Sequence, residues 1–421
     1  MKEIEKKYKK ALDKALIEFI KQNPKNIFTN NEKKAFFYKY IQKYRKRFKN
    51  SKTCMFPDCN EKSIKHSHTI QKNGGLKMIA EKNHVYRPVF SYEKSKITMK
   101  KTSINYASTF PGFCIEHESA FNSFEKNKEF KYDRDIKLQL FRSLCRELHE
   151  KNILLENNIN KKNEYKNYQL DNFKKILAKY LRKMKLKKKF YKLMLDSKDF
   201  KILFMNNLIE DLNKDIESLS NNYFNPLFRD IEKEENNIYY QTVLIEHLVP
   251  VCLSGLASFK KDKSTTRNYF IFNIIPQENG TLFTIATNVK FKNILDNYIT
   301  HYTQDPLLML IAIETLMIHA TDHWYIKPSV WDKIPENRRR KILNDILNSK
   351  KGLFTNYNIS IFDQTREHIL NILDKEDNWN QFDNKTKKFY FNERMKLMNK
   401  KSYDIFTLED LEKASIEYIN N

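Results

Sequence analysis

The chain has 421 residues, of which 40% are apolar and 13% aromatic, enough to build sizeable cores and to exclude a globally disordered protein. Its 77 Lys and Arg against 52 Asp and Glu give a net charge of +25, which points to a polyanionic partner such as nucleic acid. A chain-wide bias toward Lys and Asn is the alternative source of this charge. No Walker-type or dinucleotide-binding loop is found among only six glycines, which argues against an ATPase.

Neither a targeting signal nor a membrane span is predicted. The N-terminal segment is charged throughout, and no window approaches the ~20 apolar residues that a span requires. The most apolar run, residues 306–318, contains Glu314 and predicts a buried core helix. We therefore expect a cytoplasmic protein without a membrane partner. In a reducing compartment, closely spaced Cys and His are more typical of metal ligands than of disulfides.

The predicted fold is α+β and predominantly helical, in four parts. Residues 1–50 form two helices, 3–22 and 29–48, the second with a basic surface. Residues 51–155 form a zinc-binding domain with short strands, and residues 156–235 form a long basic helical arm. Residues 236–421 form a C-terminal α+β domain, with a small antiparallel sheet that includes a hairpin around residues 276–280 and with a helical tail.

The helical arm carries a candidate nucleic-acid-binding ridge. Apolar residues recur there at helical spacing, with Lys and Arg between them. Lysine side chains in such a pattern are suited to phosphate contacts, and an ordinary solvated helix face is the alternative interpretation. The predicted contacts are Lys183, Lys185, Lys187, Lys188 and Lys189.

Two short Cys/His pairs predict a structural zinc site. Cys54 and Cys59 bracket a Phe-Pro-Asp turn, and Cys114-x2-His117 precedes a helical run. Zn²⁺ prefers four tetrahedral nitrogen and sulfur ligands, and short chelate loops present two of them without strain. A knuckle pair followed by a pair at a helix start is the layout of a treble-clef site. A set of buried thiols is the alternative.

The order of these features over about residues 50–126 resembles the zinc-containing HNH (ββα-metal) nucleases. The segments SHTIQ (67–71) and TFPGFCIEHE (109–118) are also similar to parts of uncharacterised bacterial proteins, several of which look defence-associated. The resemblance implies an endonuclease that hydrolyses DNA or RNA, in anti-phage defence. It implies His68 as general base, with His66 or Glu118 near a catalytic Mg²⁺ or Mn²⁺ ion.

The chain departs from this family at four points. Ser67 stands where the family has an acidic metal ligand, and Asn73 and Asn105 both compete for the place of the central Asn. Glu118 stands where the family often has a His, and the insertion between the two Cys/His pairs is long. The missing acid favours a second hypothesis, a zinc-containing protein that binds nucleic acid without cleaving it.

A third hypothesis comes from Arg142-x6-His149, which is similar to the HEPN ribonuclease motif. That resemblance implies a metal-independent ribonuclease in which Arg142 binds the RNA phosphate and His149 acts as acid or base. A basic amphipathic helix is the alternative. His319 and His323, four residues apart, are expected to pack at a helix end rather than to bind a metal.

Overall fold

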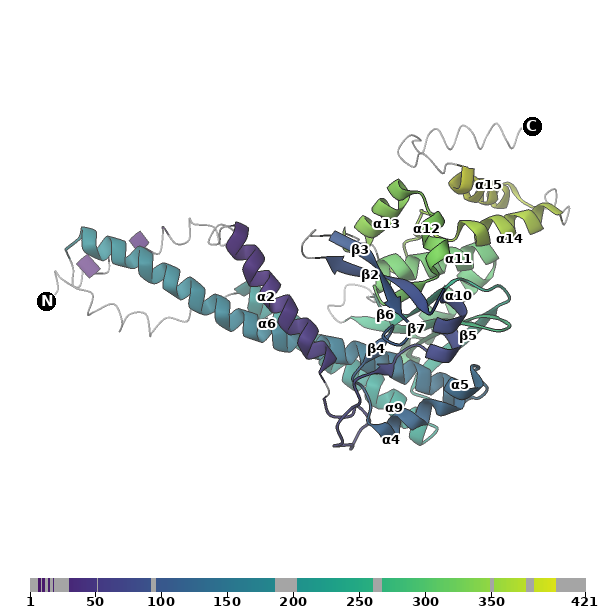
Figure 1. Cartoon of the computed structure of the whole chain (residues 1–421), viewed down its shortest axis with the longest axis horizontal. Helices are drawn as coiled ribbons and strands as arrows, with labels where there is room; N and C mark the ends of the chain where they lie inside the picture. Colours follow the sequence, from purple (N-terminus) through teal and green to yellow (C-terminus); the bar gives the residue numbers. More distant parts are fainter. Residues whose placement is uncertain are drawn as a thin grey trace. The chain divides into compact units, whose positions relative to one another are not determined.

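The computed structural model describes most of the chain, as two compact units whose helices and strands are labelled in Figure 1. The first unit comprises Met1–Asn50 and His149–Glu217, and the second comprises Ser51–Leu148 and Ser218–Asn421. Helix α6 (Asp133–Lys183) contributes to both. No helix in the described part of the chain combines the length and apolarity needed to cross a membrane. The described residues are 7, 8, 10, 11, 14, 15, 18, 30–50, 52–91, 96–185, 203–259, 267–348, 352–375 and 382–398.

In the first unit, α2 (Asn30–Lys49) is joined to α6 by polar contacts. The ammonium groups of Lys39 and Lys43 lie 2.9 and 3.1 Å from the carboxylate of Glu164. The hydroxyl of Tyr44 donates a 3.0 Å hydrogen bond to Glu150. Further along α6 the contacts become apolar, as the helical spacing in the arm predicts. There Ala11 and Ala15 pack against Phe173, Ile176, Leu177 and Leu181.

The second unit is built on a seven-stranded antiparallel sheet with the order β3-β2-β9-β6-β7-β8-β5. The predicted hairpin is confirmed as β7 and β8, with Gln277 opposite Gly280. Gly280 has φ +140°, and a Cβ there would lie 2.2 Å from the Ile245 carbonyl oxygen, so only glycine fits. The strands are β2 (His84–Ser91), β3 (Lys96–Ser103), β5 (Ile238–Ile245), β6 (Val251–Phe259), β7 (Asn268–Gln277), β8 (Gly280–Asn288) and β9 (Trp324–Ile326).

Strands β2 and β3 come from the region that the sequence assigned to the zinc-binding domain. They enter the larger sheet because β2 pairs with β9, at Tyr86 and Ile326. A separate two-stranded sheet is formed by β1 (Ser67–His68) and β4 (Thr109–Phe110).

The two faces of the seven-stranded sheet have separate cores, because successive side chains of a strand point to opposite sides. Val251 and Leu253 face the larger core, to which the helices after β8 contribute. Cys252 faces a smaller core that includes Ile70 and Val85. The predicted buried helix is confirmed as α11 (Pro306–Thr315), in which almost every side chain is buried.

Helices outnumber strands, so the predicted α+β, predominantly helical class is confirmed. The remaining α-helices are α3 (Lys77–Ile79), α4 (Ile115–Glu118), α5 (Asn122–Asn127), α8 (Leu203–Leu219), α9 (Asn225–Glu232), α10 (Lys292–Thr303), α12 (Pro328–Lys333), α13 (Glu336–Asn348), α14 (Asp363–Lys375) and α15 (Asn384–Met398). Short π and 3-10 segments are η2 (Lys72–Leu76), η3 (Ser119–Phe121), η5 (Ser220–Phe224), η6 (Val289–Phe291) and η7 (Leu316–Ala320).

His323 lies just beyond η7 and is fully enclosed by protein. Its Nε2 is 3.2 Å from the Ser108 hydroxyl, and its Nδ1 is 3.2 Å from the Ser254 carbonyl oxygen. Burial holds the pKa of His323 well below its ordinary value, so the ring is neutral and donates from Nδ1. The expectation that His323 packs at a helix end is therefore confirmed.

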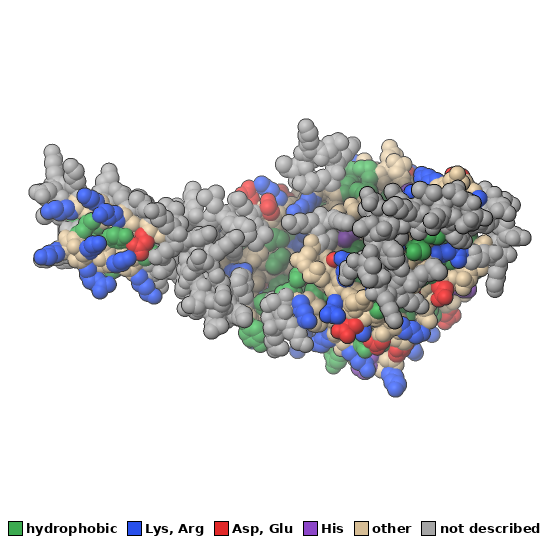
Figure 2. All heavy atoms as spheres, turned by 90° about the horizontal axis from the view of Figure 1, so that it is seen from above, with side chains coloured by type: hydrophobic (Ala, Val, Ile, Leu, Met, Phe, Trp, Pro, Cys, Tyr) green, Lys and Arg blue, Asp and Glu red, His purple; other side chains and the backbone are tan. Residues whose placement is uncertain are grey.

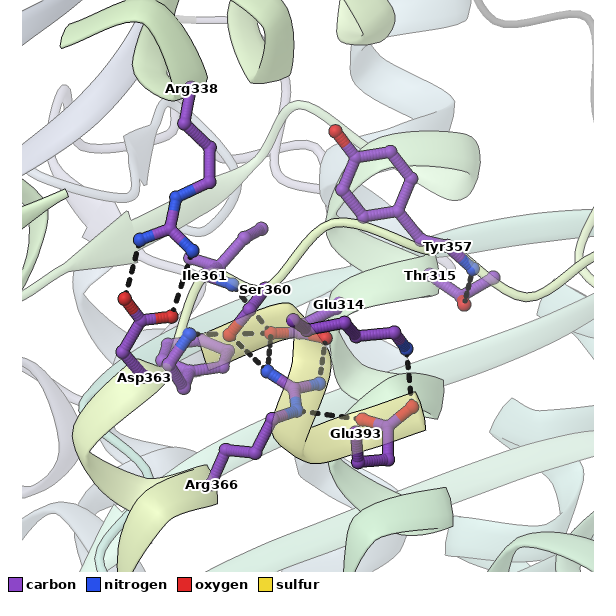
Figure 3. A network of polar contacts seen from close by, with 11 residues as sticks. Glu314, Thr315, Arg338, Tyr357, Ser360, Ile361, Asp363, Arg366 and Glu393 are labelled. Carbon is purple, nitrogen blue, oxygen red and sulfur yellow. Dashed lines mark hydrogen bonds and ion pairs between the residues drawn. The ribbon is translucent and has the colours of Figure 1, made fainter. Parts of the chain in front are cut away.

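A buried ionic network joins α11, α14 and α15 (Figure 3). The guanidinium of Arg366 is fully buried, and its Nη2 and Nε lie 2.7 and 2.8 Å from Glu314 and Glu393 respectively. Glu314 also accepts hydrogen bonds from the amides of Ile361 and Phe362, at 2.7 and 3.3 Å. This network explains how Glu314 is accommodated in an otherwise apolar helix, since a buried charge must be paired.

Replacing Arg366 with Met is expected to lower the free energy of unfolding by about 3–5 kcal/mol, because Glu314 would stay buried without a charged partner. Arg340 is the control, because it forms an exposed ion pair with Glu336, and Arg340→Met should cost no more than about 1 kcal/mol. Urea unfolding of both variants measures the difference. Equal, small losses would show that the buried network contributes little.

Candidate metal centre

The first half of the Cys/His cluster is a tight turn. Cys54 donates its amide to the Glu61 carbonyl at 2.8 Å, and Cys59 donates to the Phe56 carbonyl at 3.3 Å. Asp58 adopts a left-handed conformation with φ 62°, which reverses the chain between the two thiols. The turn thus directs both sulfur atoms to the same side.

The second half of the cluster is a helix start. Strand β4 is followed by α4, whose N-cap is Cys114, and the Cys114 sulfur accepts from the His117 amide at 3.5 Å. One helical turn separates the two side chains, so they face the same direction. The amide of Met55 donates to the Gly112 carbonyl at 2.9 Å and ties the turn to this segment.

The four donor atoms meet as predicted and form one group. Sγ of Cys54, Cys59 and Cys114 and a ring nitrogen of His117 lie within 4.8 Å of one another. Nδ1 of His117 is 3.6 Å from the Cys54 sulfur and 3.3 Å from the Cys114 sulfur, and the sulfurs of Cys59 and Cys114 are 4.0 Å apart. Tetrahedral bonds of the lengths that zinc forms place such atoms about 3.6 and 3.8 Å apart. These residues could therefore hold a metal ion such as zinc.

The surroundings of the cluster affect both the protonation and the orientation of its ligands. Burial raises the pKa of the Cys54 thiol to about 12, so binding of a cation would release a proton and would become weaker as the pH falls. The ring of His117 stacks on Phe56 with a centroid distance of 4.3 Å, which fixes the ring plane and aims Nδ1 at the sulfurs. Among the described residues, no other group of three or more Cys, His, Asp or Glu has donor atoms placed to hold a metal ion.

His68 lies on β1, beside this centre, and is half-buried. Its Nε2 is 3.1 Å from the Ile104 carbonyl oxygen, whereas no hydrogen bond is found for Nδ1 among the described residues. Burial, with the nearby positive charge of Arg142, lowers the pKa of His68 to about 4. The ring is therefore neutral near pH 7, with its proton on Nε2 and an acceptor at Nδ1. His66, the other candidate on this segment, is exposed and packs edge-on against Tyr106 at 5.5 Å.

Glu118 is held by an arginine that the sequence had suggested for RNA binding. The guanidinium of Arg142 lies 3.1 Å from Glu118 and 2.7 Å from Glu125, and only 2% of its side chain is exposed. It also lies over the ring of Phe121, 4.6 Å from the centroid. Burial raises the pKa of Glu118 despite this partner. Glu125, on the following helix α5, was not predicted.

The remaining predicted site residues have separate environments. Nε2 of His149 lies 2.9 Å from the Phe48 carbonyl oxygen, within the first unit. Arg142 pairs instead with Glu118, within the second unit. Lys183 and Lys185 are exposed at the end of α6. The other predicted contacts, Lys187, Lys188 and Lys189, lie outside the described residues.

The fold and the Cys/His centre define an α+β protein with a candidate metal site. Comparisons of the chain with protein-family models, with curated proteins and with solved structures found no match.

Purified without chelators, the protein is expected to contain about one zinc ion per chain, because all four ligand atoms converge. Cys114→Ala should abolish this content and lower the melting temperature. Cys145→Ala is the control, since Cys145 is a buried thiol outside the cluster and its loss should leave zinc content unchanged. Plasma mass spectrometry measures the metal. A wild-type protein without bound metal would contradict the assignment.

Proposed function

We propose that this protein binds nucleic acid, with a structural zinc ion in the Cys54, Cys59, Cys114 and His117 centre. The observation that carries the proposal is the distribution of charge. Residues 172–195 contain ten Lys or Arg and no Asp or Glu, so 24 residues supply ten units of the net +25. A chain-wide preference for Lys does not explain such a concentration, whereas a phosphate-binding surface does.

The described part of this segment has the geometry of a ridge. The buried face of α6 carries Phe173 and Leu177, which leaves the lysines on the solvent side. Lys175 and Lys183 are exposed and eight residues apart, so they lie on one face of the helix. In Figure 2, Lys and Arg side chains surround the left end, where Figure 1 places the end of α6, and others are scattered over the rest of the visible face. Within this segment Lys179 forms an ion pair with Glu18, at 3.1 Å.

Replacing Lys175, Lys183 and Lys185 together with Ala tests the ridge. Each lost phosphate contact lowers the slope of log Kobs against log salt by about 0.9 on duplex DNA and about 0.7 on a single strand, so a total change of about 2–3 is expected. Fluorescence anisotropy with a 30-base-pair duplex and a 30-nucleotide RNA, across a salt series, provides the measurement.

A matched control removes the same charge elsewhere. Lys233, Lys290 and Lys341 are exposed in the second unit, and their triple Ala variant should bind with nearly unchanged salt dependence. An equal loss in both triple variants would show that net charge alone, and not the ridge, attracts the polyanion.

A second candidate function is hydrolysis of the bound nucleic acid, and the tautomer of His68 favours it. With Nε2 bonded to the Ile104 carbonyl, Nδ1 is left as an acceptor that could take a proton from a water molecule. The resulting hydroxide would attack a phosphodiester phosphorus, and the P–O bond to one ester oxygen would break. That oxygen would leave as a hydroxyl group after taking up a proton from the solvent or from the ring. A catalytic Mg²⁺ or Mn²⁺ ion at Glu118 does not fit the residues as they stand, because Arg142 already pairs with Glu118 and Glu125. The same ion pairs favour the binding protein over the nuclease.

If the second candidate is right, His68→Ala should lower cleavage by about 10²- to 10⁴-fold without loss of zinc. Because the neutral ring is the base and its pKa is about 4, the wild-type rate should fall only as the pH drops toward 4. Plasmid and RNA cleavage in EDTA, Mg²⁺ or Mn²⁺ are the assays. His84→Ala, on β2, is the control. Binding without cleavage under every condition would leave the first candidate alone.

A further inference from the structure

We propose that Arg87 and Lys100, on neighbouring strands of the seven-stranded sheet, bind a phosphate group. For the source of that phosphate, a phosphodiester of the bound strand, this rests on the proposed nucleic-acid-binding function. It adds a contact in the second unit to the ridge on α6. Inorganic phosphate alone tests the site, so the site and the proposed function can fail separately.

Two positive side chains face each other across a strand pair. Arg87 on β2 lies directly opposite Lys100 on β3 in the antiparallel register. Directly opposite side chains share one face of a sheet, with Cβ atoms about 4.5–5.5 Å apart, and like charges placed there are destabilising. An anion bound by both side chains removes this repulsion.

The guanidinium of Arg87 lacks an acceptor. Its Nε is buried, and neither a hydrogen bond nor an ion pair is found for this side chain among the described residues. Buried polar atoms without a partner are uncommon in proteins. Elsewhere in the second unit arginines pair with carboxylates, as do Arg134, Arg142, Arg146, Arg229, Arg338, Arg339, Arg340 and Arg366. A phosphate would supply the acceptor that Arg87 lacks.

The position of the pair in the sheet separates it from ordinary edge protection. Lysines on an edge strand prevent pairing with another chain, which accounts for Lys100 on β3 taken by itself. Arg87 lies on an inner strand, because β2 pairs with β3 on one side and with β9 on the other. Edge protection therefore does not account for the arginine.

Arg87 is held against the protein and not extended into solvent. Its side chain is partly buried, and Val85, two residues earlier on the same face of β2, packs into the smaller core. The charge of Arg87 also acts on His323, since burial and the positive charges of Arg146 and Arg87 hold the pKa of His323 well below its ordinary value. A guanidinium fixed in this way can present two parallel N–H donors to a phosphate.

Isothermal titration calorimetry of the full chain with inorganic phosphate, at constant ionic strength, measures the site. We expect the wild type to bind about one phosphate ion. Arg87→Gln and Lys100→Gln should each weaken binding about 10- to 100-fold, the range that charge-assisted hydrogen bonds produce. Lys101→Gln is the matched control, because Lys101 is next in sequence but lies opposite Tyr86, on the other face of the sheet.

Thermal melting provides a second measurement that does not depend on Arg87 variants. Lys100 is exposed, so Lys100→Gln should fold. Without phosphate and at low salt, this variant should melt no lower than the wild type, because the repulsion with Arg87 is gone. Added phosphate should raise the melting temperature of the wild type and of Lys101→Gln, but not that of Lys100→Gln.

Oligonucleotide binding then identifies the source of the phosphate. If it is a phosphodiester, Arg87→Gln should lower the salt slope on a single-stranded RNA by about 0.7. Phosphate binding through Arg87 without any nucleic-acid binding would refute the proposed function and leave a site for a free phosphate compound. A wild type that binds no inorganic phosphate, or an equal loss of binding in Lys101→Gln, would overturn the inference.

Discussion

The burial of Arg142 is the constraint on which the second unit depends. A guanidinium removed from water is tolerated only beside carboxylates, so α6 fits only where Glu118 and Glu125 meet it. On a neighbouring face of the same helical turns, Gln139 and Ser143 hydrogen-bond to the side chain of Asn273 on β7, at 3.1 and 2.7 Å. The start of α6 therefore contacts both α4 and α5, through Glu118 and Glu125, and the seven-stranded sheet, through Asn273. These contacts fix the position of the helix between them.

The hydrogen-bonded side chains of Gln139, Ser143 and Asn273 form a polar layer between α6 and the sheet. We interpret this layer as favouring one packing arrangement rather than a high free energy of unfolding. The amide of Gln139 also donates to the Thr69 carbonyl at 2.9 Å, yet Oε1 of Gln139, Nδ2 of Asn273 and Oγ of Ser254 are buried without partners among the described residues. A satisfied hydrogen bond contributes only about 1 kcal/mol net, whereas a buried polar group left unpaired costs about 1–3 kcal/mol. An apolar layer would be more stable here. The polar layer instead makes any shifted packing of α6 on the sheet unfavourable.

The sequence predicts those parts of the molecule that depend on nearby residues. Cys114 and His117 share one helical turn, and the β7–β8 hairpin is set by a tight turn at Gly280, so local spacing was sufficient for both. The pairing of Tyr86 with Ile326 joins segments about 240 residues apart, which no local pattern encodes. The ion pairs of Arg142 could not be predicted either, because a basic residue on a helix gives no sign of which carboxylates from earlier segments will bury it.

The donor set of the Cys/His centre limits what a bound metal could do. A catalytic zinc ion keeps one coordination position for water or substrate, but four protein donors complete a tetrahedron. A zinc ion held by all four would therefore support the fold rather than the chemistry. In the proposed hydrolysis the neutral ring of His68 would be the base, and the carboxylate of Glu118 is already paired with Arg142. The ion pairs of Arg142 with Glu118 and Glu125 therefore favour the proposed binding function over the proposed hydrolysis.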